Sequence, residues 1–393
     1  MKKIFFVALS ATLLAAGCQK TEVLNPVGGP TMSFNTGMGK ITKSVGTADA
    51  EAAGLKNLEA QDFSVWAYAD PDSDFASSTV VDATTKIYDG IQNLLVKCTA
   101  ASQDAVVDNP ETTTDETAAA VAGTWVTEQE YFWPGDGKDL RFFAVSADGD
   151  WLRPTSGTCP VEINYNTPSL DIKNFVVRAV KDGDKTAANE DLMVADFVKQ
   201  NQSKKVVDLK FRHTLSKIEF VFKTLAAATG ETAPTVYVQS LKVEDLQNKG
   251  DLSVTPVDAT ATPIVWSYVW KNDADSEADY TDDWSEEVVY ASTVEAAAQT
   301  DKTAMLLTTE AKTFATWLML PQTITGKKVE ITYIINNRQF TSVFPIDNTD
   351  ISLTKWACNQ HIKYTITLAP NVISFNPSVE EWKTPADNVE YQN

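Results

Sequence analysis

The residue types best suited to covalent chemistry lie near the start of the chain. Cys18 follows Leu14-Ala15-Ala16-Gly17, behind a basic start at Lys2-Lys3 and a short apolar run. This order is typical of an export signal, and the run is too short to cross a bilayer of about 30 Å. A Cys directly after small residues at a cleavage point can accept a diacylglycerol group. The sequence therefore predicts a lipoprotein signal peptide over residues 1–17 and acylation, including palmitate, of Cys18.

The segment behind this Cys carries no strong pattern. Residues 18–30 contain Asn, Pro and Gly, which indicates a flexible tether. Gln19 gives no inner-membrane retention signal. We therefore expect a lipid-anchored protein of the outer membrane that is displayed at the cell surface.

The polar residues elsewhere do not form a catalytic pattern. The chain has no Gly-x-Ser-x-Gly elbow, no His-Glu-x-x-His pair and no phosphate-binding loop. Of its two histidines, His213 and His361, the first lies on the apolar phase of an alternating segment, which favours a hydrogen-bonded core histidine. We expect no catalytic residue, no cofactor and no enzymatic activity.

Two acidic segments contain several carboxylates, the ligand type that calcium prefers. Asp70-Pro-Asp72-Ser-Asp74 has carboxylates at alternate positions, but Phe75 and Val81 stand where a calcium loop needs Gly and a bidentate acid. The acidic stretch 273–283 also lacks the required Gly. Both are interpreted as solvated loops without a metal.

The other cysteines do not suggest a metal centre either. Three remain besides Cys18, an odd number that allows at most one intramolecular disulfide: Cys98, Cys159 and Cys358. Their spacing matches no metal site, so buried free thiols are favoured and the disulfide state stays open.

Composition narrows the class of partner. The formal net charge is −20, the isoelectric point is about 4.5 and 43% of the residues are hydrophobic. A nucleic-acid partner is excluded because binding it needs Lys and Arg to neutralise phosphates. The ten tryptophans raise a second hypothesis, a surface glycan-binding protein, which would need several of them on one exposed face.

Alternation with period two is the dominant pattern and predicts many short strands. Odd positions are apolar over 207–215 and even positions over 218–222, which predicts one long strand with a β-bulge near Ser216. Alternation on both sides of Asn336-Asn337 predicts a hairpin with a turn of positive φ. Many short strands separated by turn residues favour an all-β sandwich architecture.

Several segments together resemble the fimbrillin family, the type V pilins of Gram-negative anaerobes. They are Tyr131-Phe132-Trp133-Pro134, Leu140-Arg141-Phe142-Phe143-Ala144, Asp191-Leu192-Met193-Val194-Ala195, Phe211 to Ile218, Leu318-Met319-Leu320-Pro321-Gln322, Trp356 with Tyr364-Thr365-Ile366, and Ile373-Ser374-Phe375 with Val379-Glu380-Glu381-Trp382. Their order covers the chain from about residue 30 to 382. One departure is Ala357-Cys358-Asn359, where a Pro-Gly type of turn is expected after the tryptophan.

The resemblance implies two transthyretin-like Greek-key β-sandwich domains in tandem, which we place at 31–203 and 204–393. It implies a structural pilin subunit that serves adhesion, with other pilin subunits as partners and host glycans or proteins as targets. It also implies export as a lipoprotein and assembly by strand exchange after a trypsin-like protease removes the first strand.

The alternating pattern suggests which segments take part in that exchange. Met32 to Met38 alternates and is followed by a small, polar stretch, where we expect cleavage after Lys43, with Lys40 as the second choice. The segment 373–382 has the same period, with donor side chains Ile373, Phe375, Val379 and Trp382. The hypothesis is that this second segment replaces the first in one groove. The patterns do not distinguish a stalk, tip or anchor subunit.

Overall fold

The computed structural model describes residues 29–36, 62–73, 75, 81–82, 84–99, 124–135, 137–147, 149–155, 157–177, 191–257, 266–273, 277–283, 304–370 and 372–381. Within these ranges the chain forms strands, together with one helical turn, α2 (Gly149–Leu152), and one 3-10 turn, η1 (Thr349–Ile351). The predicted all-β class is confirmed. No helix in these ranges is long and apolar enough to cross a membrane.

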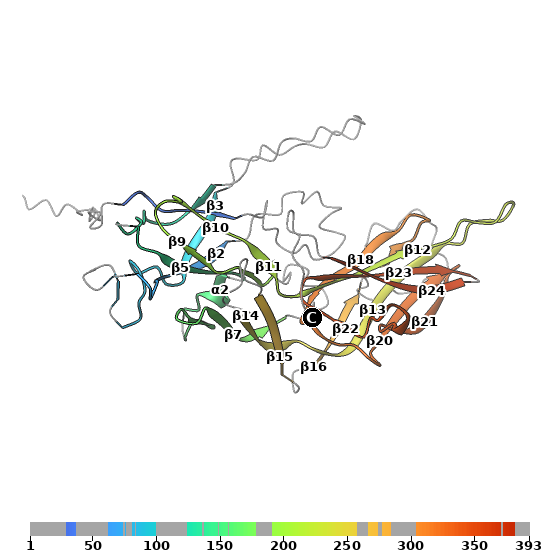
Figure 1. Ribbon diagram of the computed structural model, residues 1–393. Coiled ribbons are helices and arrows are strands. Elements are labelled where there is room, and N and C mark those ends of the chain that lie inside the picture. The colour runs from blue at the N-terminus through green and yellow to red at the C-terminus, as the bar shows by residue number, and fades with distance from the viewer. Residues whose placement is uncertain are drawn as a thin grey trace, which may run out of the picture.

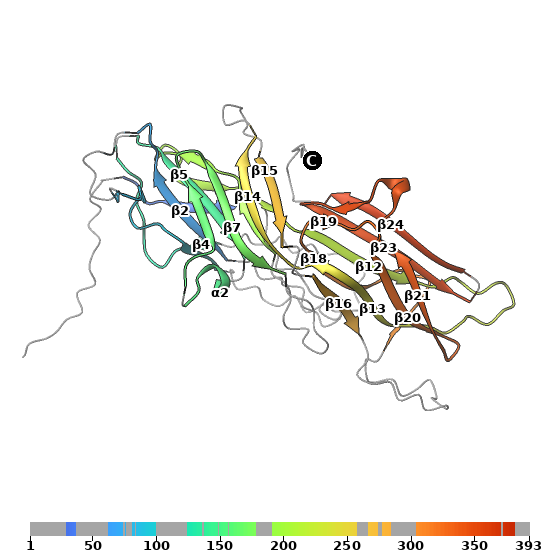
Figure 2. The same cartoon turned by 90° about the horizontal axis from the view of Figure 1, so that it is seen from below.

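The strands form two lobes that lie end to end (Figures 1 and 2). The first lobe has three sheets. One has seven strands, β2 (Phe63–Ala69), β3 (Leu94–Thr99), β4 (Thr124–Val126), β5 (Leu140–Ser146), β8 (Met193–Ala195), β9 (Val198–Gln200) and β11 (Phe211–His213). The second has four, β6 (Val161–Asn164), β7 (Ser169–Val176), β14 (Lys249–Pro256) and β15 (Trp266–Asn272). The third pairs β1 (Ser33–Thr36) with β10 (Val206–Leu209).

The seven-stranded sheet is the middle layer of this lobe. Every residue of β2 is buried, because both faces of the strand are covered. Trp66 and Phe143 lie in the same core as Leu252 of the four-stranded sheet. On the opposite face, Val65 and Phe142 belong to a separate core that β1 and β10 help to close. Alternate side chains along a strand of this sheet therefore enter two different apolar cores, whereas in a simple sandwich every second side chain would face solvent.

The second lobe is a two-sheet sandwich. One sheet contains β12 (Ser216–Lys223), β18 (Lys312–Met319), β23 (Gln360–Ala369) and β24 (Val372–Glu381). The facing sheet contains β13 (Val236–Gln247), β16 (Glu277–Asp283), β17 (Met305–Leu306), β20 (Lys328–Ile335) and β21 (Arg338–Pro345). A small two-stranded sheet joins β19 (Gln322–Thr323) to β22 (Lys355–Trp356). The core of the sandwich contains Phe220 and Tyr364, whose rings stack with centroids 5.1 Å apart.

The long strand predicted over 207–222 is wrong. This stretch is three strands in three sheets: β10 pairs with β1, β11 with β8, and β12 with β18 and β23. The phase change near Ser216 marks the passage from the first lobe to the second, and no bulge is needed there. The backbone is held at the passage by bonds to later segments, Asn359 N to Leu215 O at 3.0 Å and Ser216 Oγ to Ala357 O at 2.8 Å.

Two turns show how Asn supplies left-handed backbone. The predicted hairpin at Asn336-Asn337 is confirmed, with φ of 49° and 65° between β20 and β21. After Trp356, Asn359 has φ of 57°, so it adopts the conformation for which a Gly was expected. The turn at 357–359 therefore has a left-handed residue although the segment contains no Gly.

Strand pairing crosses the predicted division of the chain at residue 204. Strands β10 and β11 pair with β1 and β8, and β14 pairs with β7. The chain thus enters the second lobe at β12, returns for β14 and β15, and leaves again. Division into two tandem domains at this position stays a prediction.

Glu219 links three strands of the sheet that carries β24. It accepts hydrogen bonds from Thr313 Oγ1 of β18 at 2.6 Å and contacts His361 Nε2 of β23 at 2.8 Å. The bond with His361 lowers the pKa of Glu219 to about 2, against the opposing effect of burial.

A folded-state pKa below the ordinary value stabilises the protein above about pH 4.5, and this contribution is lost as the pH falls toward 2. We expect Glu219→Gln to lower the free energy of unfolding at pH 7 by about 2 kcal/mol and to flatten its decline between pH 5 and 2. Urea denaturation across that range measures both effects. Glu330→Gln, at an exposed position, is the control. An equal loss of unfolding free energy in both variants would contradict the stabilising role of Glu219.

Candidate functional site

The first strand occupies a groove in the first lobe. Met32 and Phe34 point into the core and are each 6% exposed. The Phe34 ring meets Phe142 edge-on, with centroids 6.4 Å apart. The predicted first strand is confirmed over Ser33–Thr36, the part of it that the structure describes.

The groove holds this segment from both sides. On one side β1 runs parallel to β10, and Asn35 Nδ2 donates to Asp208 Oδ1 at 3.2 Å. On the other side Met32 N donates to Tyr131 O at 2.7 Å, and Trp133 N donates to Pro30 O at 3.0 Å. Gly29 lies so close to Trp133 that an added Cβ would be 2.1 Å from its carbonyl oxygen.

Beneath the segment lies an apolar floor. Trp133, Phe142, Val207 and Leu209 are fully buried there, and the Trp133 indole donates to Lys205 O at 3.0 Å. Without residues 29–36 these side chains would meet water, and the backbone of Tyr131, Trp133 and β10 would lose its partners. A groove of this kind accepts another extended, alternating strand.

The last described strand is an edge strand. β24 forms an antiparallel hairpin with β23, in register from Ala369↔Val372 to Gln360↔Glu381, and it is the end strand of its sheet. Pro377 lies in this strand, and Pro within sheets is confined to edge strands, first residues and bulges. Figure 2 shows β24 beside β23 at the side of the second lobe.

The inward row of β24 is incompletely covered. Ile373, Phe375 and Val379 pair with inward-facing residues of β23. Phe375 stacks on Phe344 at 5.4 Å and on Tyr364 at 5.1 Å, whereas Ile373 and Val379 remain 40% and 41% exposed. Apolar side chains on a core-facing row would normally be buried far more deeply.

Four predicted site residues fall outside the described residues: Cys18, Lys40, Lys43 and Trp382. The two lysines follow the end of β1 by four and seven positions along the chain. Lipidation, cleavage and the role of Trp382 stay predictions.

His213 is a core residue, as predicted. It lies on β11, is 7% exposed, and its Nδ1 hydrogen-bonds to the buried carboxylate of Asp191. His213 is the last residue of β11, and Asp191 lies two positions before β8, the strand that pairs with β11. The sequence pattern indicated burial of the histidine but not its acidic partner 22 positions earlier.

In the first of the two acidic segments, the carboxylate of Asp70 pairs with basic side chains of the protein itself. Asp70 is buried and contacts Arg141 Nη2 at 3.1 Å and the Lys199 ammonium. Burial raises the pKa of Asp70, but the hydrogen bonds from Lys199 and Asp72 N and the Arg141 charge outweigh it and hold the pKa below its ordinary value. No cluster of three His, Cys, Asp or Glu among the described residues could hold a metal ion.

The cysteines show no pairing where they are described. Cys159 and Cys358 are free thiols, and burial raises the pKa of Cys358 to about 12. Cys98 lies on β3, and its side chain is outside the described set. A thiol with so high a pKa is unreactive at neutral pH.

The chain is similar to a known protein family and to several solved structures. The profile of the fimbrillin-like family matches residues 59–382. A fimbrial protein from Bacteroides vulgatus is 14% identical, with 90% of this chain and 100% of that chain covered and a TM-score of 0.49. A fimbrial assembly protein from Parabacteroides distasonis is 10% identical, with 89% and 98% covered and a TM-score of 0.38. No curated protein matches the sequence.

The His213–Asp191 pair allows a test of the core assignment. We expect His213→Gln to lower the free energy of unfolding by about 1–3 kcal/mol, because a buried hydrogen bond to a carboxylate is lost. Asp191→Asn and the double variant complete a thermodynamic cycle in chemical denaturation. Additive losses would show that the two residues do not stabilise each other.

Proposed function

We propose that this chain, which belongs to the fimbrillin-like family, is a structural subunit of a cell-surface fimbria. The subunits polymerise by donor-strand exchange, and the fimbria serves adhesion. The observation that carries the proposal is a matched pair of segments. One, β1, fills an apolar groove, and the other, β24, is an alternating edge strand whose inward row is half exposed.

Weak attachment of β1 supports its role as the strand to be replaced. The described part of the strand has four residues, and two apolar side chains, Met32 and Phe34, anchor it. Burial of each contributes about 1.5–3 kcal/mol. Cleavage at Lys40 or Lys43 would leave the strand held by these two side chains and by its hydrogen bonds with Tyr131, Trp133 and β10, so that a longer strand could displace it.

The geometry of β24 supports its role as donor. It has ten residues, and as an edge strand it can leave β23 without separating β12 or β18. Its departure would break the stacking of Phe375. Insertion into a groove like that of β1 would bury Ile373 and Val379 more completely, which favours the exchanged state.

The route to the surface is part of the same proposal. The precursor is anchored to the outer membrane through acylated Cys18, and a trypsin-like protease cuts after Lys43 or Lys40. The cut removes the anchor together with β1, so release from the membrane and opening of the groove are one event. Other subunits of the fimbria are then the partners of the opened groove.

A tryptophan platform for glycans is not favoured. Trp133, Trp317 and Trp356 are fully buried, and Trp66 is 2% exposed. The other described tryptophans, at 125, 151, 266 and 270, are partly buried, so none of those described is an exposed residue of the surface.

The donor assignment is tested with two neighbouring residues of opposite face. Ile373 and Val372 are similarly exposed, at 40% and 45%, but only Ile373 lies on the inward row. After trypsin treatment of purified precursor, we expect SDS-resistant ladders in the wild type and in Val372→Ser. We expect their loss in Ile373→Ser and on deletion of residues 371–393.

Mass spectrometry of the cleaved product locates the cut. Ladders that persist in the deletion variant, or cleavage away from Lys40 and Lys43, would overturn the assignment. Equal loss of the ladders in both serine variants would show that the face of the strand on which the residue lies does not decide polymerisation.

Anchoring is tested separately. We expect Cys18→Ser to abolish labelling by a fatty-acid analogue and to release the precursor from the outer-membrane fraction. Cys159→Ser is the matched control, since its thiol is described and free. Labelling that survives Cys18→Ser would exclude this residue as the acylation site.

A further inference from the structure

A polar cavity of about 430 Å³ lies where the two lobes meet. Strand β15 of the first lobe contributes Trp270 and Asn272, and the end of β13 contributes Gln247. The segment after β18 contributes Pro321, Gln322 and Thr323. Pockets of 300–1,000 Å³ with a few convergent polar groups are typical of small-ligand sites. The volume suits one sugar ring.

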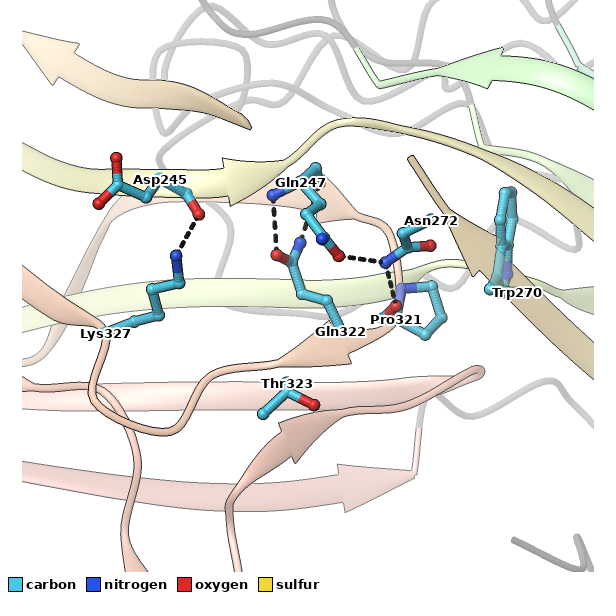
Figure 3. Close-up of a pocket in the computed structure, with 8 residues that line it drawn as sticks. All are labelled: Asp245, Gln247, Trp270, Asn272, Pro321, Gln322, Thr323 and Lys327. Atoms are coloured by element: carbon cyan, nitrogen blue, oxygen red, sulfur yellow. Dashed lines mark hydrogen bonds between the residues drawn. The ribbon is translucent and has the colours of Figure 1, made fainter. Parts of the chain in front are cut away.

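The amide side chains in this cavity are held in fixed positions (Figure 3). Gln322 Oε1 accepts from Gln247 N at 2.9 Å, and Gln322 Nε2 donates to Gln247 O at 3.0 Å. Asn272 Nδ2 donates to Pro321 O at 2.9 Å and to Gln247 Oε1 at 3.1 Å. A site whose groups are already ordered loses less entropy when a ligand binds.

The same network decides which amide atoms are left for a ligand. The carbonyl of Pro321 requires a donor, which orients the Asn272 amide, and this in turn directs Gln247 Oε1 toward Asn272. Gln247 Nε2 and the exposed Thr323 hydroxyl then have no hydrogen-bond partner among the described residues. They provide two donors and a hydroxyl acceptor.

Trp270 supplies an apolar wall beside these amides. Its ring is fixed by a hydrogen bond from Nε1 to Thr214 O at 2.8 Å and by packing against Phe175, with centroids 6.0 Å apart. Fixed amide donors and acceptors next to an indole match a pyranose, which presents hydroxyl groups around its rim and C–H bonds on its faces. We propose that this cavity binds one neutral hexose unit of a glycan.

Charge favours a neutral ligand over an acidic one. The lining includes one acidic residue, Asp245, and one basic residue, Lys327, so it carries no net charge. The whole chain carries −20, which repels anions at longer range. The site draws on both lobes and is separate from β1 and β24, so it goes beyond strand exchange and does not depend on it.

The test uses the full-length monomer, so a failure of polymerisation does not affect it. Saturation-transfer NMR and calorimetry are performed with glucose, galactose, mannose and N-acetylglucosamine, and with N-acetylneuraminic acid as the anionic comparison. Thr323→Phe fills the cavity from an exposed position and should preserve the fold. Thr325→Phe, exposed on the same segment but outside the cavity, is the matched control.

We expect at least one neutral sugar to bind at millimolar concentration, Thr323→Phe to weaken it at least tenfold, and Thr325→Phe to leave it unchanged. Gln247→Leu, which removes the free donor, should also weaken binding, with a melting temperature that checks the fold. Binding only of N-acetylneuraminic acid, no binding of any sugar, or equal binding by Thr323→Phe would each overturn the proposal.

Discussion

The central seven-stranded sheet has apolar side chains on both faces, and this constraint organises the molecule. One face is covered by a four-stranded sheet of ordinary size, whereas the other depends on the short pair β1 and β10. Two apolar anchors, Met32 and Phe34, and hydrogen bonds with β10, Tyr131 and Trp133 fix β1, so one strand completes the cover of that face. In the strand exchange that we propose, the strand that completes the fold is therefore also the one that is replaced.

The second lobe has the complementary imbalance. Its two sheets pack around Phe220, Trp317 and Tyr364, and β21 and β24 are end strands of those sheets. Phe344 of β21 stacks on Phe375 of β24, while Phe340 and Ile373 stay over one-third exposed. A row that is already half hydrated loses less apolar burial on leaving its sheet than a central strand would.

Polar interactions hold the regions that strand exchange would leave in place. Asp70 with Arg141 and Lys199 fixes the end of β2, and His213 with Asp191 fixes β11. At the meeting of the lobes, Trp270 of β15 bonds to Thr214 O, Asn359 N bonds to Leu215 O, and the glutamine pair joins β13 to β19. Buried polar groups with fixed partners favour one arrangement of the lobes, and the cavity between them inherits that rigidity.

The all-β class, the Asn336-Asn337 hairpin, the buried His213 and the alternation of 32–36 and 373–379 followed from the sequence alone. These depend on side-chain period and turn chemistry, which are local. The sequence could not show that 207–222 divides among three sheets, because a phase change looks the same for a bulge and for a change of sheet. Nor could it show the partners of Asp70, His213 and Gln247, which lie far along the chain and meet only after the strands have paired. The tertiary structure decided them, since contacts between distant residues depend on topology and not on any pattern within one segment.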